Sequence, residues 1–365
     1  MMNKIENKNN KTKRYAANIL LAAVFIVVIT LIDQNLIGDQ YIKRVLNLSA
    51  IYAIVAVSMN LVNGFTGLFS LGQAGFMAIG AYTVAVFTVP INYRASIFYI
   101  VPQNQVLAQI HLPFFIALIL GGLAAALVAL LIGIPVLRLK SDYLAIATLG
   151  FSEIIRIVFT NLKTITNGAL GIKSIPGVST WVIFIVAILS IVLIALLINS
   201  TYGRAFKAIR EDEIAAEAMG INLFKHKVMS FAIGAFFAGI GGGLFAALLG
   251  TVDPKQFYFT MTYNFLLMIV LGGMGSITGT IISSFIVTFG LEFLRFFDEP
   301  LAMFGYNITF FRAGFRMVIF SILLMILVLF FRKGLLGQKE LSWKLISNIF
   351  KGKNSNKKSN KGGAA

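Results

Sequence analysis

The chain has 365 residues, of which 58% are hydrophobic and 12% charged, with a formal net charge of +17 and no cysteine. A soluble core of this size does not need so much apolar surface, and the lack of cysteine excludes disulfides, thiolate metal sites and cysteine nucleophiles. The basic residues gather where membrane topology would place them, on one side of the predicted spans, so we expect no nucleic-acid partner.

Apolar runs long enough to cross about 30 Å of hydrocarbon as helices recur along nearly the whole chain. We therefore expect an all-α integral membrane protein, a polytopic helical bundle of about ten transmembrane helices. The predicted spans cover residues 16–33, 45–63, 68–89, 113–137, 143–160, 180–199, 228–250, 261–273, 277–297 and 314–331.

The spans divide the chain into three parts. Residues 1–15 form a basic cytoplasmic N-terminus, 16–337 the transmembrane domain, and 338–365 a basic tail that we expect to be disordered, cytoplasmic and attracted to anionic membrane lipid. Because both basic ends obey the positive-inside rule on the same side, both termini are predicted to be cytoplasmic.

Several polar side chains fall within predicted spans of the first half. Such residues are expensive at membrane depth, so they either line a translocation pathway or form hydrogen bonds between closely packed helices. The candidates for the pathway are Asn60, Asn63, Ser70, Gln73, Thr148 and Glu153. Glu153 and Arg156 share a helix face at i,i+3 spacing, which favours a structural ion pair.

A predicted outer loop contains Asn167, Gly168 and Gly171. It is a candidate surface for docking a binding protein or for substrate entrance.

The single sizeable polar loop predicted on the inner side covers residues 202–227. Its charge pattern and Gly220 predict one short amphipathic helix, a turn and a basic return to the membrane, with Ile209, Ile214 and Ala218 on one apolar strip. By pattern alone, such a helix is either a solvated connector or a docking element for a partner.

The segment around Gly272, Gly273 and Gly275 is the weakest of the predicted spans, because its apolar part is short. It is either a tight turn or the unwound middle of a broken helix, a feature that often marks substrate pathways. Upstream, Gly239 and Gly243 have the G-x-x-x-G spacing of a helix contact.

The sequence offers no enzyme chemistry. It has no phosphate-binding loop of the G-x-x-x-x-G-K-[ST] type, no catalytic triad or paired carboxylates, and two distant histidines, His111 and His226, that do not suit a metal cluster. We expect no cofactor or metal in this chain, and any ATP with its Mg to be bound by partner subunits.

Several motifs resemble those of known transport proteins. Ala-Ala-Glu-Ala-Met-Gly at 215–220 is similar to the E-A-A-x-x-x-G coupling loop of ABC importer permeases, although Ile214 stands where that family has glutamate. Six further segments resemble LivM-type permeases of branched-chain amino-acid ABC transporters. They are 59–85, 141–161, the segment TNGALGIKSIP after them, GRA at 203–205, GGMG at 272–275 and FRKGLLG at 331–337. The resemblance covers about residues 45–337.

This resemblance implies an inward carrier of branched-chain or similar apolar amino acids in the bacterial cytoplasmic membrane. It implies four kinds of partner: a LivH-like second permease, two ABC ATPase subunits, an extracytoplasmic amino-acid-binding protein and membrane lipid. The implied ATPase-coupling residues are Gly203, Arg204, Arg210, Glu211, Asp212, Glu213, Ala215, Ala216 and Gly220. The alternatives are a permease for another small solute, such as urea, amides or nucleosides, and an ion-coupled secondary transporter or a channel.

Overall fold

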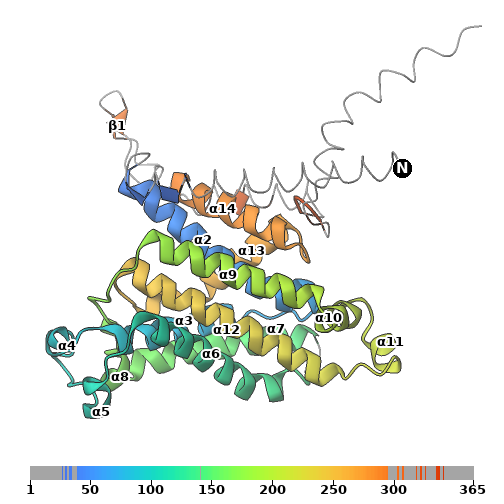
Figure 1. Ribbon diagram of the computed structural model, residues 1–365, viewed down its shortest axis with the longest axis horizontal. Coiled ribbons are helices and arrows are strands. Elements are labelled where there is room, and N and C mark those ends of the chain that lie inside the picture. The colour runs from blue at the N-terminus through green and yellow to red at the C-terminus, as the bar shows by residue number, and fades with distance from the viewer. Residues whose placement is uncertain are drawn as a thin grey trace, which may run out of the picture.

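Long helices that run nearly parallel to one another make up most of the computed structural model (Figure 1). The structure describes residues 27, 29–30, 33–34, 39–139, 141–294, 302–303, 306–307, 318, 321–322, 325, 334–337 and 340. The predicted segment 1–15, the predicted spans 16–33 and 314–331, and the predicted tail 338–365 lie wholly or mostly outside these residues.

Within the described residues, five helices are long and apolar enough to cross a membrane. They are α2 (Gln40–Asn60) with the π-helical turn η1 (Leu61–Phe65), α6 (Phe114–Val136), α7 (Ser141–Asn161), α9 (Thr180–Asn199) and α12 (Leu223–Leu249). Their bounds agree closely with the predicted spans. In hydrocarbon the backbone N–H and C=O groups of a long apolar segment can form their hydrogen bonds within the segment only if it is a helix.

Shorter elements connect the long helices. They are α4 (Ile91–Ile97), α5 (Gln105–Gln109), α8 (Lys163–Thr166), η2 (Gly168–Leu170), α10 (Thr201–Glu211), α11 (Glu213–Ala218), η3 (Pro254–Phe257), and the antiparallel strands β1 (Ala302–Met303) and β2 (Tyr306–Asn307). Figure 1 places α10 and α11 at one end of the bundle and α4, α5 and α8 at the other.

The predicted span 68–89 is a shorter helix than expected. Helix α3 (Gln73–Thr88) begins five residues late, because 66–72 is non-helical and Gly67 has φ +79°. At its other end α3 meets α4 at a bend of 116°. The predicted start at residue 68 was therefore wrong, whereas the predicted end at 89 agrees with the end of α3 at Thr88.

Helices α13 (Phe259–Gly272) and α14 (Ile277–Phe293) form a pair joined by a tight turn. At 1.5 Å per residue they are only about 21 and 26 Å long, shorter than the roughly 30 Å of a bilayer core. The segment 261–279 is therefore a helix, a turn and the start of a second helix.

Glycines bring α3, α6 and α12 into close contact at the centre of the bundle. A β-carbon on Gly80 would lie 2.0 Å from the Gly239 carbonyl oxygen, and one on Gly242 would lie 1.9 Å from that of Met77. Gly243 packs against Val84 and Leu118. The predicted G-x-x-x-G contact is confirmed, since small residues allow neighbouring helix backbones to approach.

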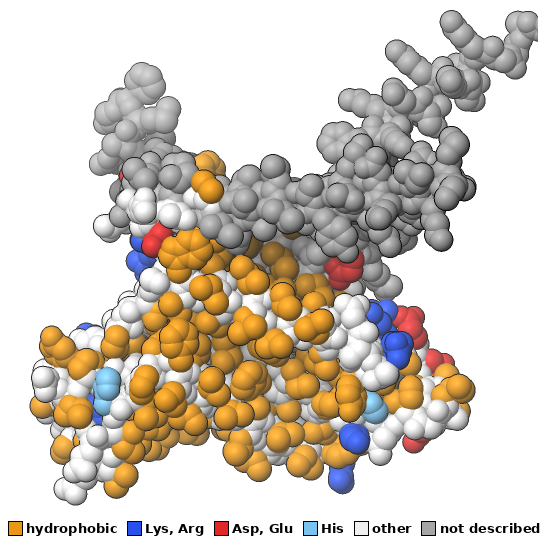
Figure 2. Space-filling view, viewed as in Figure 1, with side chains coloured by type: hydrophobic (Ala, Val, Ile, Leu, Met, Phe, Trp, Pro, Cys, Tyr) orange, Lys and Arg blue, Asp and Glu red, His pale blue; other side chains and the backbone are white. Residues whose placement is uncertain are grey.

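The surface agrees with a membrane position. Figure 2 shows hydrophobic side chains over the middle of the visible face, with lysine and arginine toward its two ends. The chain is thus a multi-pass membrane protein built as a helical bundle.

Candidate functional site

The predicted coupling loop 202–227 contains two helices instead of the one expected. Asp212 separates α10 from α11 in an extended conformation, and its carboxylate accepts hydrogen bonds from the amides of Ile214 and Ala215 at 2.8 and 3.0 Å. Aspartate is a preferred N-cap because it satisfies amides that have no partner within the helix. An N-cap aspartate was the signal in the sequence that could have revealed the second helix.

The division into two helices also separates the predicted apolar strip. Ile209 in α10 is buried, whereas Ile214 and Met219 are 82% and 83% exposed. Ala216 is buried within the loop itself, at 3% exposure. The prediction of one strip through Ile209, Ile214 and Ala218 was wrong, and α11 instead presents two large apolar side chains to its surroundings.

The two ends of the coupling loop are fixed to the bundle. Gly203 is buried, and a β-carbon there would lie 2.1 Å from the Ile198 carbonyl oxygen. Glu213 and Lys227 form an ion pair at 2.6 Å. Gly220, with φ +83°, turns the chain after α11, in a conformation that L side chains rarely adopt. Arg204 and Glu217 are exposed.

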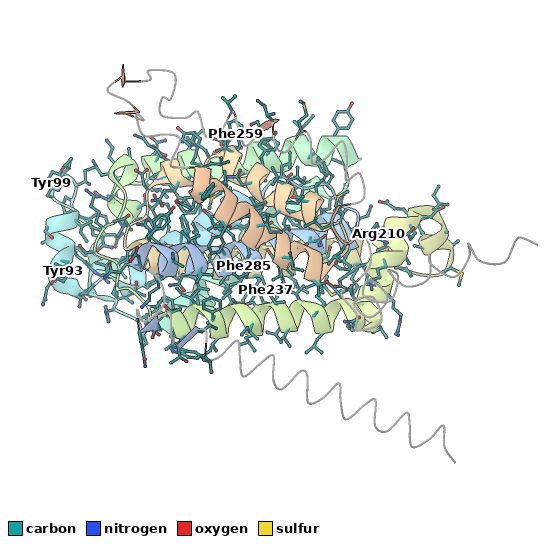
Figure 3. All side chains as sticks on the ribbon, turned by 90° about the horizontal axis from the view of Figure 1, so that it is seen from above. Tyr93, Tyr99, Arg210, Phe237, Phe259 and Phe285 are labelled. Carbon is teal, nitrogen blue, oxygen red and sulfur yellow. The ribbon has the colours of Figure 1, made fainter. Side chains whose placement is uncertain are left out.

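Arg210 connects the coupling loop to the two glycine-rich breaks in the bundle. Its guanidinium donates to the Gly64 carbonyl oxygen at 3.0 Å and pairs with Glu211. A β-carbon on Gly67 or on Gly275 would lie 3.0 Å or less from the Arg210 side chain. Arg210 lies at one end of the molecule, opposite Tyr93 and Tyr99 (Figure 3). Residues predicted separately, from the coupling loop and from the gate or turn, therefore meet here.

The gate or turn, residues 272–275, is held on several sides. Gly272 packs against Gly279, while Gly273 and Gly275 have φ +110° and +89°. Asn60 accepts from the Gly275 amide at 3.0 Å and donates to the Ser276 carbonyl oxygen at 3.0 Å. A predicted pathway residue is thus bonded to the predicted gate.

The other predicted pathway residues near the break in 61–73 are buried and hydrogen-bonded. Asn63 bonds in both directions with the Ser70 backbone at 3.1 and 3.2 Å, and Gln73 donates to Ser58 at 2.6 Å. Thr148 in α7 accepts from the Leu71 amide at 2.9 Å. The Asn63 and Thr148 contacts satisfy backbone groups that the missing helical turns leave unpaired, as irregular backbone at membrane depth requires, whereas the Gln73 contact joins two side chains.

Glu153 lies apart from this cluster, nearer the C-terminal end of α7. It forms the predicted ion pair with Arg156 at 2.7 Å and accepts from the Phe259 amide at 3.3 Å. The Arg156 guanidinium lies 4.3 Å above the Tyr258 ring. The pair therefore connects α7 to the start of α13.

The predicted entrance loop is tightly folded. Asn167, in the left-handed region at φ 59°, donates to the carbonyl oxygens of Ile97 and Gly171 at 3.1 and 2.8 Å. A β-carbon on Gly168 would lie 2.9 Å from the Thr160 carbonyl oxygen, and one on Gly171 2.1 Å from that of Val252. The loop thus contacts the end of α4 at Ile97, the end of α7 at Thr160 and the segment after α12 at Val252.

A cavity of about 500 Å³ lies beside the gate. Its lining includes Lys207, Arg210, Gly275, Thr278 and Glu340. The Glu340 carboxylate accepts from the Ile277 amide at 2.7 Å and the Thr278 amide at 3.1 Å, which caps the start of α14. Glu340 belongs to the segment predicted as a disordered tail, and a lone glutamate gave no signal of this contact.

Helix α7 differs from the other long helices in its surface. Of the five long spans in the described part of the chain, it is the least apolar and also the least buried. Its exposed side includes Tyr143, Ile146, Ile154 and Ile157, and nothing lies within 4 Å of a β-carbon on Gly150. This exposed side, hereafter the α7 face, is apolar, whereas Thr148 and Ser152 on the same helix are buried.

Comparison with known proteins places these features in a family context. A family model described as the branched-chain amino acid transport system permease component matches residues 41–329. The chain is 37% identical to LivM, the high-affinity branched-chain amino acid transport system permease protein of Escherichia coli, and 38% identical to that of Salmonella typhimurium. Each match covers 69% of this chain and 63% of the relative.

The LivH permease protein of the same Escherichia coli system is 24% identical, over 70% of this chain and 85% of the relative. No solved structure matches the chain. The chain thus spans somewhat less than two thirds of the length of the two LivM relatives.

Proposed function

Since the chain belongs to the family of branched-chain amino acid transport system permeases, we propose that it is a transmembrane permease subunit of an ATP-binding-cassette importer for branched-chain or similar apolar amino acids. The family match carries this proposal.

We further propose ten membrane helices and two cytoplasmic termini, with the spans 16–33 and 314–331 completing the bundle in a bacterial inner membrane.

The coupling loop is the proposed contact with an ATPase subunit. Its support is a pair of exposed apolar side chains, Ile214 in α11 and Met219 directly after it. Large apolar groups surrounded by charge suit a groove in a partner protein better than water. On this proposal ATP is bound and hydrolysed by the partner, with Mg, and this chain contributes no cofactor.

The proposed route of coupling passes through Arg210. A movement of α10 would act directly on the Gly64 carbonyl oxygen and on the turn at Gly275, because Arg210 contacts both. Both contacts lie where a helix ends. At such a place the backbone can change its conformation and break few of the hydrogen bonds within the helix. Nucleotide could then switch the side to which the pathway opens, provided that it binds the two states with different affinity.

The remaining proposed partners are a LivH-like permease, two ABC ATPase subunits and an extracytoplasmic amino-acid-binding protein. The α7 face is the proposed contact with the second permease, because α7 has the smallest buried share of the five long spans in the described part of the chain. The pathway would then run between the two permeases.

The test is leucine uptake into vesicles that contain the full complex, with ATP inside and binding protein outside. We expect uptake that requires both. ATP-dependent uptake of another solute, with none of leucine, would keep the importer and contradict the substrate. Uptake driven by an ion gradient without ATP would contradict the coupling loop assignment.

A further inference from the structure

We propose that Arg156 binds the carboxylate of the transported amino acid in the outer half of the pathway, and that Glu153 positions it. The inference rests on the proposed function and names a substrate-binding residue within it. Arg156 precedes the end of α7 by five residues, or about 7.5 Å of helix, so it lies below the outer end of the span.

The first observation concerns the N–H donors of the Arg156 guanidinium that are not used within the protein. Its Nε atom donates to Glu153, and among the described residues its two terminal nitrogens have no hydrogen-bond partner. The Arg156 side chain is 17% exposed, so part of it lies at the surface of the protein. A guanidinium whose Nε is occupied still presents a terminal pair of N–H groups, which can bind a carboxylate.

The second observation is how firmly the guanidinium is held. Glu153 bonds to Arg156 with one carboxylate oxygen and accepts from the Phe259 amide with the other. The Tyr258 ring lies 4.3 Å below the guanidinium carbon. Because the side chain is already ordered, little conformational entropy is lost when a ligand binds.

The third observation is the surroundings of the charge. Ile157, one helical turn from Glu153, is half exposed, and Tyr258, Phe259 and Tyr263 are exposed to a similar extent. Figure 3 places Phe259 between the end that bears Tyr93 and Tyr99 and the end that bears Arg210. A charged group among exposed apolar and aromatic side chains suits a zwitterion with an aliphatic side chain.

The charge balance fits the same ligand. Glu153 compensates Arg156 in the empty protein, so no net charge is buried in the span. A zwitterionic amino acid also carries no net charge, and its ammonium group can approach the remaining lone pairs of Glu153. Binding and release therefore leave the net charge within the span unchanged, as a transport pathway requires.

Arg156→Lys separates a role in binding from one in structure. Lysine keeps a cation beside Glu153 and above the Tyr258 ring, but it lacks the paired N–H groups of the guanidinium. Lys43→Gln is the matched control, because Lys43 forms an ion pair with Asp33 at 2.9 Å with comparable exposure.

The experiment uses the complete complex in liposomes, with ATP inside and leucine-loaded binding protein outside at saturation. Loss of a hydrogen bond to a charged group weakens binding by a factor of about ten to a hundred. For Arg156→Lys we expect leucine uptake to fall by that factor, while ATP hydrolysis and thermal stability stay at the wild-type level. Lys43→Gln should leave all three unchanged.

Wild-type leucine uptake by Arg156→Lys would overturn the inference. A joint fall in uptake, ATP hydrolysis and thermal stability would also overturn it, because it would assign the pair a purely structural role. Absence of leucine uptake by the wild-type complex would instead contradict the proposed function, so the two failures are distinguishable.

Discussion

Replacing Gly80 by alanine should destabilise the bundle where α3 crosses α12. A β-carbon at position 80 would lie 2.0 Å from the Gly239 carbonyl oxygen, whereas real β-carbons essentially never approach a heavy atom closer than 3.0 Å. The helices must therefore separate by about 1 Å, the difference between 3.0 and 2.0 Å. Backbone atoms cannot rotate away from the new methyl group as a side chain would.

The expected magnitude follows from two opposing effects. Overpacking costs about 1 to 3 kcal/mol, and a clash with backbone belongs at the upper end of that range. Alanine recovers up to about 1 kcal/mol of helix propensity relative to glycine. The net loss of stability is therefore about 2 kcal/mol, and the separation also weakens the contact between Gly242 and the Met77 carbonyl oxygen.

The measurement is the thermal stability of the detergent-solubilised protein. It is read as the fraction that stays monodisperse on gel filtration after heating. Gly290→Ala is the matched control, because no atom of the described residues lies within 4 Å of a β-carbon at that position in α14. Gly80→Ala should melt several degrees below wild type, and Gly290→Ala at or above it. Equal melting temperatures for Gly80→Ala and wild type would refute the close crossing of α3 and α12.

Three further predictions concern the end of the molecule that bears α10 and α11. Arg210→Ala should abolish leucine uptake while ATP hydrolysis continues in the reconstituted complex, because it removes the bond to the Gly64 carbonyl oxygen. Its control is Lys225→Ala, at an exposed lysine of the same loop that is not among the implied coupling residues. Ala216→Arg should abolish coupling by disrupting α11, while Ile214→Asp should leave the chain folded and weaken its co-purification with the ATPase. Glu340→Gln should speed amide hydrogen exchange at the start of α14, by losing a charged cap of about 0.5 to 2 kcal/mol.

Each of these predictions has a result that contradicts it. Uptake by Arg210→Ala equal to that of Lys225→Ala would contradict the proposed route from α10 to the helix breaks. Normal uptake by Ala216→Arg, or full retention of the ATPase by Ile214→Asp, would exclude the coupling loop as the contact. Unchanged exchange in Glu340→Gln would show that the carboxylate contributes nothing to α14.

The sequence by itself was sufficient for the long helices and the family. The predicted span 180–199 matches α9, and 113–137 matches α6 within one residue at each end, because apolar length alone commits a segment to a membrane helix. The predicted Glu153–Arg156 pair also formed, since i,i+3 partners on one helix need no tertiary structure to meet.

Only the tertiary structure decided where helices break and which side chains meet across the breaks. The irregular segment 61–72 depends on Asn60, Gln73 and Thr148, whose partners are as distant in sequence as Ser276. The exposure of Ile214, the bond from Arg210 to Gly64 and the Glu340 cap likewise arise from packing. A polar side chain in a span must find a partner, but the identity of that partner depends on which helices become neighbours, and local sequence does not contain that information.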